Sequence, residues 1–212
     1  LAQARRSREE HVVQGILACL VRRGTTGEGA HVEISLLEAM LDLQLEVLTT
    51  HFNDGGQPPP RASLNNAHAY LGAPYGVYAT ADGYLAIAMN PLDKLGELLE
   101  LPELAACSAR DAFQKRDQIK AQIAETLKQR TTEQWLELLQ PAGLWCAEVL
   151  DWPRLIQHEA FQALDMTQQV ERRPGVTLKT TRCPLRINGE RMSSAVGAPA
   201  VGQHTDSTAR DF

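Results

Sequence analysis

The pattern of apolar and charged positions near the start of the chain predicts a helix over residues 15–23. Four apolar residues recur at helical spacing and share one face: Ile16, Leu17, Leu20 and Val21. Arg22 and Arg23 fall in the last turn of this helix, where cations complement the negative end of the helix dipole. Gly24, which can take a positive φ, is expected to end it.

A short strand and a second helix are predicted directly afterwards. Residues 32–34 alternate apolar and polar side chains, as in a strand. Ser35 and Glu38 have the spacing of a capping box, in which each side chain accepts a hydrogen bond from the other residue's backbone N–H. The next segment, residues 36–52, is apolar on nearly every face. Such a helix is expected to be buried all round, in a core or against a partner chain.

The glycines between these two helices allow two interpretations. Gly24, Gly27 and Gly29 could form a phosphate-binding loop, which needs a strand before the glycines and a helix N-terminus after them. Here a helix precedes the glycines and a strand follows them, so the N–H groups would point the wrong way. We therefore favour a plain turn between helix and strand.

Turn-forming residues and a proline run then separate this first region from a predicted hairpin. Residues 52–67 read as a stiff, turn-rich linker at a domain boundary, although a plain spacer fits as well. Residues 77–78 and 84–88 are predicted strands, and Asp82 with Gly83 is a strong turn dipeptide between them.

Helices dominate the middle of the chain. Thr131 and Gln134 form another capping box, which opens a helix with Trp135 as a core anchor. A strand is expected over residues 142–149, and a short helix over residues 151–163. Later residues add a strand-like stretch at 170–187 and a closing tail at 197–206. Two apolar stripes at helical spacing come before the capping box: Leu92, Leu95, Leu98 and Leu99, then Ala112, Ile119, Ile123 and Leu127.

Composition and charge narrow the class of protein. The 212 residues are 43% apolar and 22% charged, as in an ordinary globular chain of one or two domains. A net charge of −5 without a basic stripe argues against binding to nucleic acid. The chain contains no run of 18 apolar residues, no signal peptide and no histidine or cysteine cluster, so we expect neither membrane association nor a metal site. Four widely spaced cysteines favour reduced thiols in a cytoplasmic protein.

Three segments together resemble the family III CoA-transferases, which include formyl-CoA transferase, carnitine CoA-transferase and α-methylacyl-CoA racemase relatives, the CaiB/BaiF group. Residues 15–39 carry Gly-Ile-Leu-Ala, Arg-Gly-Thr-Thr-Gly-Glu-Gly and Ser-Leu-Leu-Glu-Ala. Residues 74–83 match the pattern Pro-Tyr-x-x-Tyr-x-Thr-x-Asp-Gly, and residues 199–206 match Pro-x-x-Gly-x-His-Thr-Asp. The resemblance extends from about residue 14 to residue 206.

The resemblance implies a mixed α/β fold, the C-terminal part of the family III CoA-transferase fold. A helix-rich small domain with a β-hairpin would be flanked by segments of an incomplete Rossmann-like large domain. Residues 1–55 would belong to the large domain, 56–70 to a linker, 71–165 to the small domain and 166–212 to a return to the large domain. His204 and Asp206 in that return are expected to serve packing. Because the chain begins at Leu1 without an initiator Met, we expect a fragment or a processed product.

The resemblance also implies the chemistry. Family members move CoA from an acyl-CoA to a carboxylic acid through an aspartyl mixed anhydride and an enzyme–CoA thioester. The family's spacing puts the nucleophilic aspartate near Arg5, but no Asp precedes Asp42, so no catalytic residue is assigned in this chain. The substrates would be acyl-CoA and a carboxylic acid, without a further cofactor, and the expected assembly is an interlocked homodimer.

The substrate-binding candidates lie around the predicted hairpin. In the transferases, the loop before this hairpin covers the active site of the partner subunit. Gly72, Ala73, Pro74 and Tyr75 fall in that loop and are the predicted substrate-binding residues. His68 could also touch substrate, although a lone loop histidine more often hydrogen-bonds a neighbour.

Two alternatives to a transferase stay open. Racemase relatives carry a proton-relaying glutamate where this chain has Asn90, which cannot exchange a proton near neutral pH. This substitution makes racemisation the less favoured reaction. The chain could instead be a non-catalytic fragment or a subunit that completes a separate N-terminal half.

Overall fold

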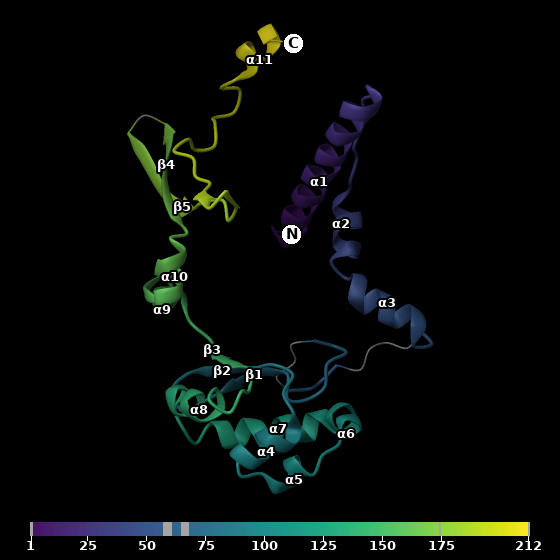
Figure 1. Cartoon of the computed structure of the whole chain (residues 1–212), viewed down its shortest axis with the longest axis vertical. Coiled ribbons are helices and arrows are strands. Elements are labelled where there is room, and N and C mark those ends of the chain that lie inside the picture. The colour runs from purple at the N-terminus through teal and green to yellow at the C-terminus, as the bar shows by residue number, and fades with distance from the viewer. Residues whose placement is uncertain (1, 57–60, 65–67, 174, 212) are drawn as a thin grey trace. The chain divides into compact units, whose positions relative to one another are not determined.

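The computed structural model describes residues 2–56, 61–64, 68–173 and 175–211 (Figure 1). Residues 57–60 and 65–67, part of the predicted linker and of the loop that follows it, lie outside the described residues. The chain divides into two compact units, Leu1–Val149 and Leu150–Phe212, and each is considered by itself.

Three helices begin the first unit: α1 (Ala2–Thr26), α2 (Leu36–Asp42) and α3 (Leu45–Asn53). The predicted stop at Gly24 is wrong, because α1 continues to Thr26. Gly27 ends it instead, with a φ of 76° and an N–H that donates to Arg23 O at 2.9 Å. A glycine takes this left-handed backbone conformation without steric cost.

The strand predicted over residues 32–34 is also wrong, since residues 27–35 pair with no strand in the described structure. Its alternation has another cause. Val32 and Ile34 are half-buried, and a Cβ added at Gly15 of α1 would lie only 2.9 Å from Val32 Cγ1. The extended segment therefore packs closely on a helix, which selects alternate apolar residues as a sheet would.

The capping box that opens α2 is confirmed, the single long helix predicted after it is wrong, and its burial against a partner chain stays a prediction. Ser35 N–H donates to Glu38 Oε2 at 2.7 Å, and Glu38 N–H donates to Ser35 Oγ at 3.1 Å. These bonds hold the pKa of the Glu38 carboxyl below its usual value. The helix breaks between Asp42 and Leu45, and of the residues in α2 and α3 only Ala39 is buried. Most of the expected buried surface is therefore open in this chain.

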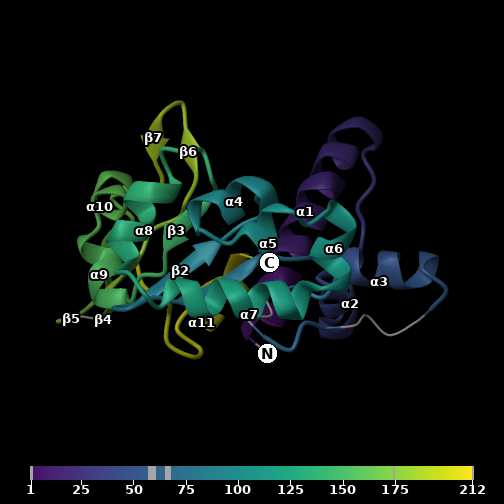
Figure 2. The ribbon, with the colours of Figure 1, turned by 90° about the horizontal axis from the view of Figure 1, so that it is seen from below.

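A small three-stranded sheet with a helical cover forms the rest of the first unit. Strands β1 (Gly76–Ala79), β2 (Tyr84–Ile87) and β3 (Cys146–Glu148) pair antiparallel in that order. Helix α7 contacts β1, and α8 contacts β3; Figure 2 shows the helices in front of the sheet, as seen from below. The covering helices are α4 (Leu92–Leu98), α5 (Pro102–Ala105), α6 (Ala109–Gln114), α7 (Arg116–Leu127) and α8 (Thr132–Leu139).

The core of this region lies between the sheet and the helices, and the apolar stripes of the sequence supply it. Tyr78 and Leu85 come from the strands, and Trp135 from α8 donates its indole N–H to Leu127 O at 2.8 Å. The predicted capping box at Thr131 and Gln134 is present. Both expected stripes are represented among the buried core residues, which include Leu92, Leu95, Leu99, Ile119, Ile123 and Leu127.

The predicted hairpin is confirmed, but its turn is built differently from the expected Asp-Gly turn. Thr80 N–H donates to Gly83 O at 3.0 Å, so Ala81 and Asp82 occupy the tip. The Asp82 carboxylate accepts bonds from the N–H and hydroxyl of Thr132, the first residue of α8, at 2.8 and 3.0 Å. A Cβ at Gly83 would lie 3.2 Å from Thr132 Oγ1. The dipeptide therefore joins the hairpin to a helix start.

The second unit has little core of its own. The helix expected over residues 151–163 is two helices, α9 (Trp152–Gln157) and α10 (Glu159–Leu164), and His158 between them caps α10 through Ala160 N–H. The strand-like stretch is a hairpin of β4 (Thr167–Arg173) and β5 (Val176–Thr181). Strands β6 (Arg186–Ile187) and β7 (Glu190–Arg191) and helix α11 (Thr205–Asp211) complete the unit.

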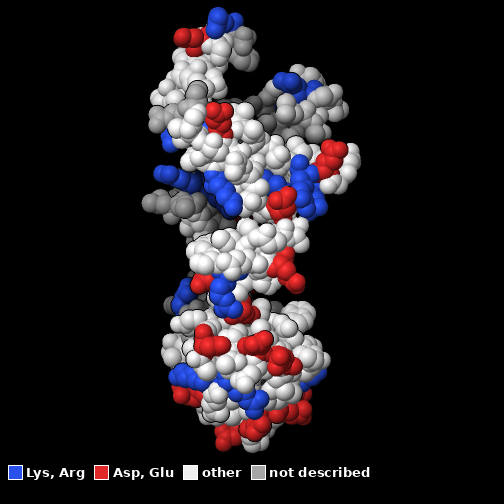
Figure 3. All heavy atoms as spheres, turned by 90° about the vertical axis from the view of Figure 1, so that its left-hand side faces the viewer, with Lys and Arg blue, Asp and Glu red and all other residues white. Residues whose placement is uncertain are grey.

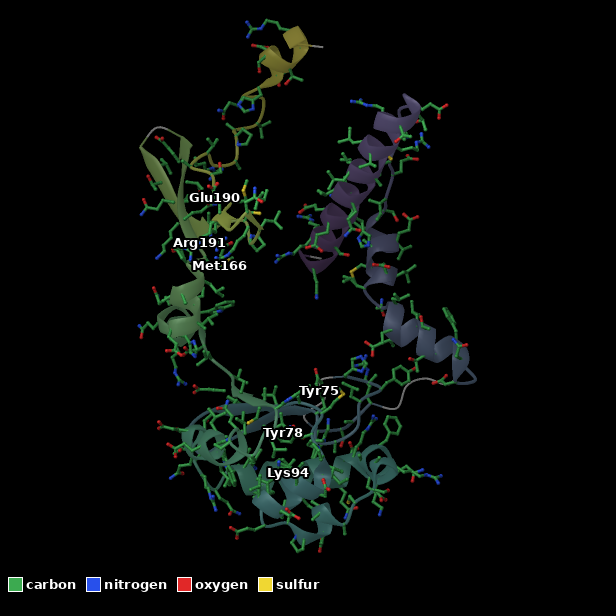
Figure 4. The ribbon with its side chains drawn as sticks, in the orientation of Figure 1. Tyr75, Tyr78, Lys94, Met166, Glu190 and Arg191 are labelled. Atoms are coloured by element: carbon green, nitrogen blue, oxygen red, sulfur yellow. The ribbon has the colours of Figure 1, made fainter. Side chains whose placement is uncertain are left out.

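Two arginines organise the end of α10. Arg182 is buried and donates to the carbonyl oxygens of Leu164, Asp165 and Cys183 at 2.7–2.8 Å. Arg191 forms an ion pair with Asp165 at 2.7 Å; Figure 4 labels Arg191 beside Met166 and Glu190. Cations at a helix C-terminus satisfy its last carbonyl groups and complement its dipole.

Candidate substrate site at the sheet of the first unit

The loop before the hairpin is fixed to the helices behind it. Ala73 N–H donates to Ala112 O at the end of α6, at 2.8 Å. A Cβ at Gly72 would lie 2.7 Å from the same oxygen, closer than real Cβ atoms come to a backbone oxygen. Gly72 is therefore required for close packing, and a larger residue there would displace the loop whatever its role in substrate binding.

The next residue of the loop is also held by the core. The Ala73–Pro74 peptide bond is cis, and Tyr78 Oη donates to Pro74 O at 2.6 Å. Burial raises the pKa of Tyr78, so the phenol keeps its proton and remains a donor near neutral pH. In Figure 4 Tyr78 lies on the helix side of the sheet and Tyr75 on the other side.

Three of the four predicted loop residues line two separate hollows, and the fourth lines neither. Gly72 and Ala73 line one of about 750 Å³, together with Asn90, Cys107 and Phe113. Tyr75 lines another, of about 430 Å³, on the outer face of the sheet with Val77 and Trp145. Pro74 is buried between them.

His68 borders neither of these hollows. Its Nδ1 accepts a bond from Tyr70 N–H at 3.2 Å, so the proton of the neutral ring sits on Nε2. Nε2 lies 3.6 Å from Glu46 Oε2. His68 thus makes one hydrogen bond to a neighbour within the loop, and its role toward substrate stays a prediction.

Asn90 has a structural function that the sequence did not reveal. Its Oδ1 accepts from Trp145 N–H at 2.7 Å, and its Nδ2 donates to Trp145 O at 3.0 Å. The side-chain amide thus copies a backbone partner and continues the β2–β3 pairing by one residue. The signal that could have found it is chemical: an amide carries both a donor and an acceptor, whereas a carboxylate only accepts.

The sheet itself carries one thiol, that of Cys146. Burial raises the pKa of the Cys146 thiol, which keeps it in the unreactive protonated form. Among the residues that the structure describes, no three His, Cys, Asp or Glu side chains are close enough to hold a metal ion. No helix of that same part of the chain is long and apolar enough to cross a bilayer.

Comparison with known proteins gives relatives of one kind. The chain is 27% identical over 209 residues to the probable fatty acyl-CoA transferase Rv3272 of Mycobacterium tuberculosis, which covers 92% of this chain and 52% of the relative. It is 29% identical over 202 residues to the succinyl-CoA:mesaconate CoA-transferase of Haloarcula marismortui, covering 90% and 48%. The chain thus spans about half the length of these relatives.

Solved structures agree with the sequence comparison. The orthorhombic crystal structure of Rv3272 from M. tuberculosis matches with a TM-score of 0.72 and 25% identity, over 94% of this chain and 53% of that one. A CAIB/BAIF family protein from Brucella suis has the same fold, with a TM-score of 0.70 and 22% identity over 96% and 53%. The model of CoA-transferase family III matches residues 10–205. This chain belongs to CoA-transferase family III.

Proposed function

We propose that this chain contributes the small-domain side of an enzyme that moves CoA from an acyl-CoA thioester to a carboxylic acid. The observation that carries the proposal is the family match over residues 10–205. The named activities of the relatives from M. tuberculosis and H. marismortui support the same reaction class. Asn90 supports transfer over racemisation, because its amide is already paired with the backbone of Trp145 and relays no proton.

The proposed reaction uses an aspartate that this chain does not supply. The carboxylate attacks the thioester carbon and CoA leaves as a thiolate, which gives a mixed anhydride. The thiolate then attacks the aspartyl carbonyl, the acyl group leaves as a carboxylate, and an enzyme–CoA thioester results. The acceptor acid repeats the sequence in reverse order. Residues 1–55 and 166–212 would belong to the large domain, residues 71–165 to the small one, and two cytoplasmic chains would interlock.

Within the loop, the geometry limits which groups could stabilise an oxyanion. Backbone N–H groups serve that purpose when they point at the developing charge. Ala73 N–H is already donated to Ala112, and Pro74 has none. We therefore assign the oxyanion contact to the N–H group of Gly72 in one hollow or of Tyr75 in the other, with Ala73 and Pro74 as the fixed support of the loop.

Expression of the whole reading frame tests the proposal. The coding DNA upstream of Leu1 is sequenced, and the full reading frame and the 212-residue chain are purified separately. Each is incubated with an acyl-CoA and a second carboxylic acid, and the new thioester is measured by chromatography. We expect transfer by the full reading frame, a CoA adduct on an aspartate by mass spectrometry, and no turnover by the chain alone. Transfer without an enzyme-bound thioester would refute the mechanism.

A second candidate function is a non-catalytic subunit that completes a separately encoded N-terminal half. The exposed apolar side chains of α2 and α3 favour it, since Leu37 is 69% exposed and Phe52 is 75% exposed. Such area normally meets a partner. Co-purification from the native organism distinguishes the two: a separate N-terminal chain supports the subunit, and a single longer polypeptide supports the enzyme.

A further inference from the structure

The outer face of the β1–β2–β3 sheet is unusual because it is apolar. In antiparallel sheets, a face that meets water normally carries polar residues at alternate positions. Here the register places Val77, Ala86 and Ala147 in one row across the three strands. Tyr84 and Trp145, on the same face, are 56% and 68% exposed. By contrast, Figure 3 shows acidic and basic side chains interspersed over the helical region below. The sheet face is therefore built to be covered by something apolar.

The shape of this face is concave. Alanines occupy its middle, and larger side chains stand at its edges: Tyr75, Val77 and Trp145. The result is a hollow of about 430 Å³, within the range of about 300–1,000 Å³ that small-molecule sites occupy. None of the residues that line it is charged.

We propose that this hollow binds the apolar chain of the acyl group. The proposal rests on the transferase function proposed above and names its substrate class. Tyr75 connects the two, because it ends the loop assigned to substrate binding and also lines the hollow. A short dicarboxylate would bring a second charge into a lining without a cation, which costs free energy, whereas methylene groups gain about 0.8 kcal/mol each on burial.

Asn90 is the positioning residue of this site. Its two bonds to the Trp145 backbone, at 2.7 and 3.0 Å, fix the edge from which the indole ring stands. Cys146 and Ile87, paired in the register, also border the hollow, and burial raises the pKa of the Cys146 thiol, so the thiol stays protonated and uncharged. The hollow therefore selects the substrate by shape and apolar area alone.

Direct binding tests the proposal independently of turnover. The 212-residue chain is labelled with ¹³C at its alanine and valine methyl groups and titrated with sodium butanoate, hexanoate and octanoate. We expect shifts at Val77, Ala86 and Ala147, and an affinity that rises by up to about fourfold for each added methylene group. Succinate at the same concentrations should leave these signals in place.

Matched variants complete the test. Ala147 and Ala163 are both exposed, but only Ala147 lines the hollow. Ala147→Leu should therefore fill the hollow and weaken octanoate binding at least tenfold. Ala163→Leu, in α10, is the matched control and should leave the binding unchanged. If Ala147→Leu fails to fold, a second pair of variants repeats the comparison. Trp145 and Trp152 are both exposed, so Trp145→Ala should weaken octanoate binding and Trp152→Ala should not. An affinity that does not change with the length of the carboxylate, or an octanoate affinity that neither Ala147→Leu nor Trp145→Ala lowers, would overturn the proposal. A stable complex in sedimentation, in which another protein chain covers this face, would also overturn it.

The two proposals fail in different ways. Octanoate binding by a full reading frame that transfers no CoA would refute the transferase function and leave the apolar site intact. Conversely, a working transferase whose preference between octanoyl-CoA and succinyl-CoA is unchanged by Ala147→Leu would refute the apolar site alone.

Discussion

Different interactions stabilise the two regions of the chain, residues 69–149 and the unit Leu150–Phe212. The first encloses 14 buried apolar residues between one sheet face and the helices. In the second, Val170 and Arg182 are the only buried side chains of the described residues, and the unit depends on hairpin pairing and on arginine bonds to carbonyl groups. The first region can specify its own structure, whereas the second requires apolar contacts beyond itself. A unit that exposes nearly all of its apolar side chains, as this one does, is typical of a surface that packs against another part of a protein.

The largest test of this contrast compares two tryptophans. Trp135 is 2% exposed and donates to Leu127 O, whereas Trp152 is 79% exposed. Trp135→Ala should destabilise residues 69–149 by about 3–5 kcal/mol, through the cavity and the lost bond. Trp152→Ala should change the stability of the chain by less than about 0.5 kcal/mol. Hydrogen exchange of the core amides of α7 and β2 measures the first effect, and hydrogen exchange of the β4–β5 amides measures the second. Equal effects would mean that the second unit has a core of its own.

The next test removes the bonds that hold the second unit. Arg182→Lys keeps the charge but loses the planar fork that reaches three carbonyl groups. We expect about 2 kcal/mol less protection of the β4–β5 amides, as for lost hydrogen bonds from a charged donor, with no change in the first unit. Arg186→Lys, on an exposed side chain, is the control. Loss of protection in both units would contradict their independence.

The smallest expected effect concerns pH and the junction between hairpin and helix in the first region. The Thr132 N–H, with the hydroxyls of Thr132 and Thr80, holds the pKa of Asp82 below its usual value of 3.8. A carboxyl whose pKa is lower in the folded state than in the unfolded state stabilises the folded state at any pH above its unfolded pKa. This stabilisation is lost as the pH falls through the pKa of the folded state.

The change that tests this is Asp82→Asn. The urea midpoint of the variant should be lower than that of the wild type at pH 7, and the two should converge below about pH 3.8. Glu97→Gln, an exposed substitution in α4, controls for the loss of one negative charge. A wild-type advantage that persists unchanged at pH 2 would show that the carboxylate charge is not what joins Asp82 to α8.

Local signals in the sequence predicted the elements well where a local interaction decides them. The capping boxes at Ser35 and Thr131 involve residues three positions apart and are present as expected. The helical stripes and the hairpin are equally local. The wrong predictions concern positions where no local sequence signal marks the structure. The alternation of residues 32–34 arises from packing on α1. The helix expected over residues 36–52 breaks at Leu43 and Gln44, where no glycine or proline is present.

The candidate site was less accessible to sequence reasoning. The loop at Gly72–Tyr75 was found only through a family resemblance, and its division between two hollows depends on a bond to Ala112, 39 positions away from Ala73. The outer sheet face could be derived only from the register of β3, because Trp145 comes to line the same hollow as Tyr75 when Cys146–Glu148 pair with the hairpin. Contacts of this separation leave no periodic pattern in the chain.

The two hydrogen bonds between the Asn90 side chain and the Trp145 backbone limit which residues position 90 can accept. A glutamate at position 90 would install an ionisable group, yet it could accept only from Trp145 N–H and would meet Trp145 O with an unfavourable lone-pair contact. A single substitution would thus add a proton-carrying group and loosen the strand. Engineering or divergence toward proton transfer at this position would require a compensating change beside β3 first.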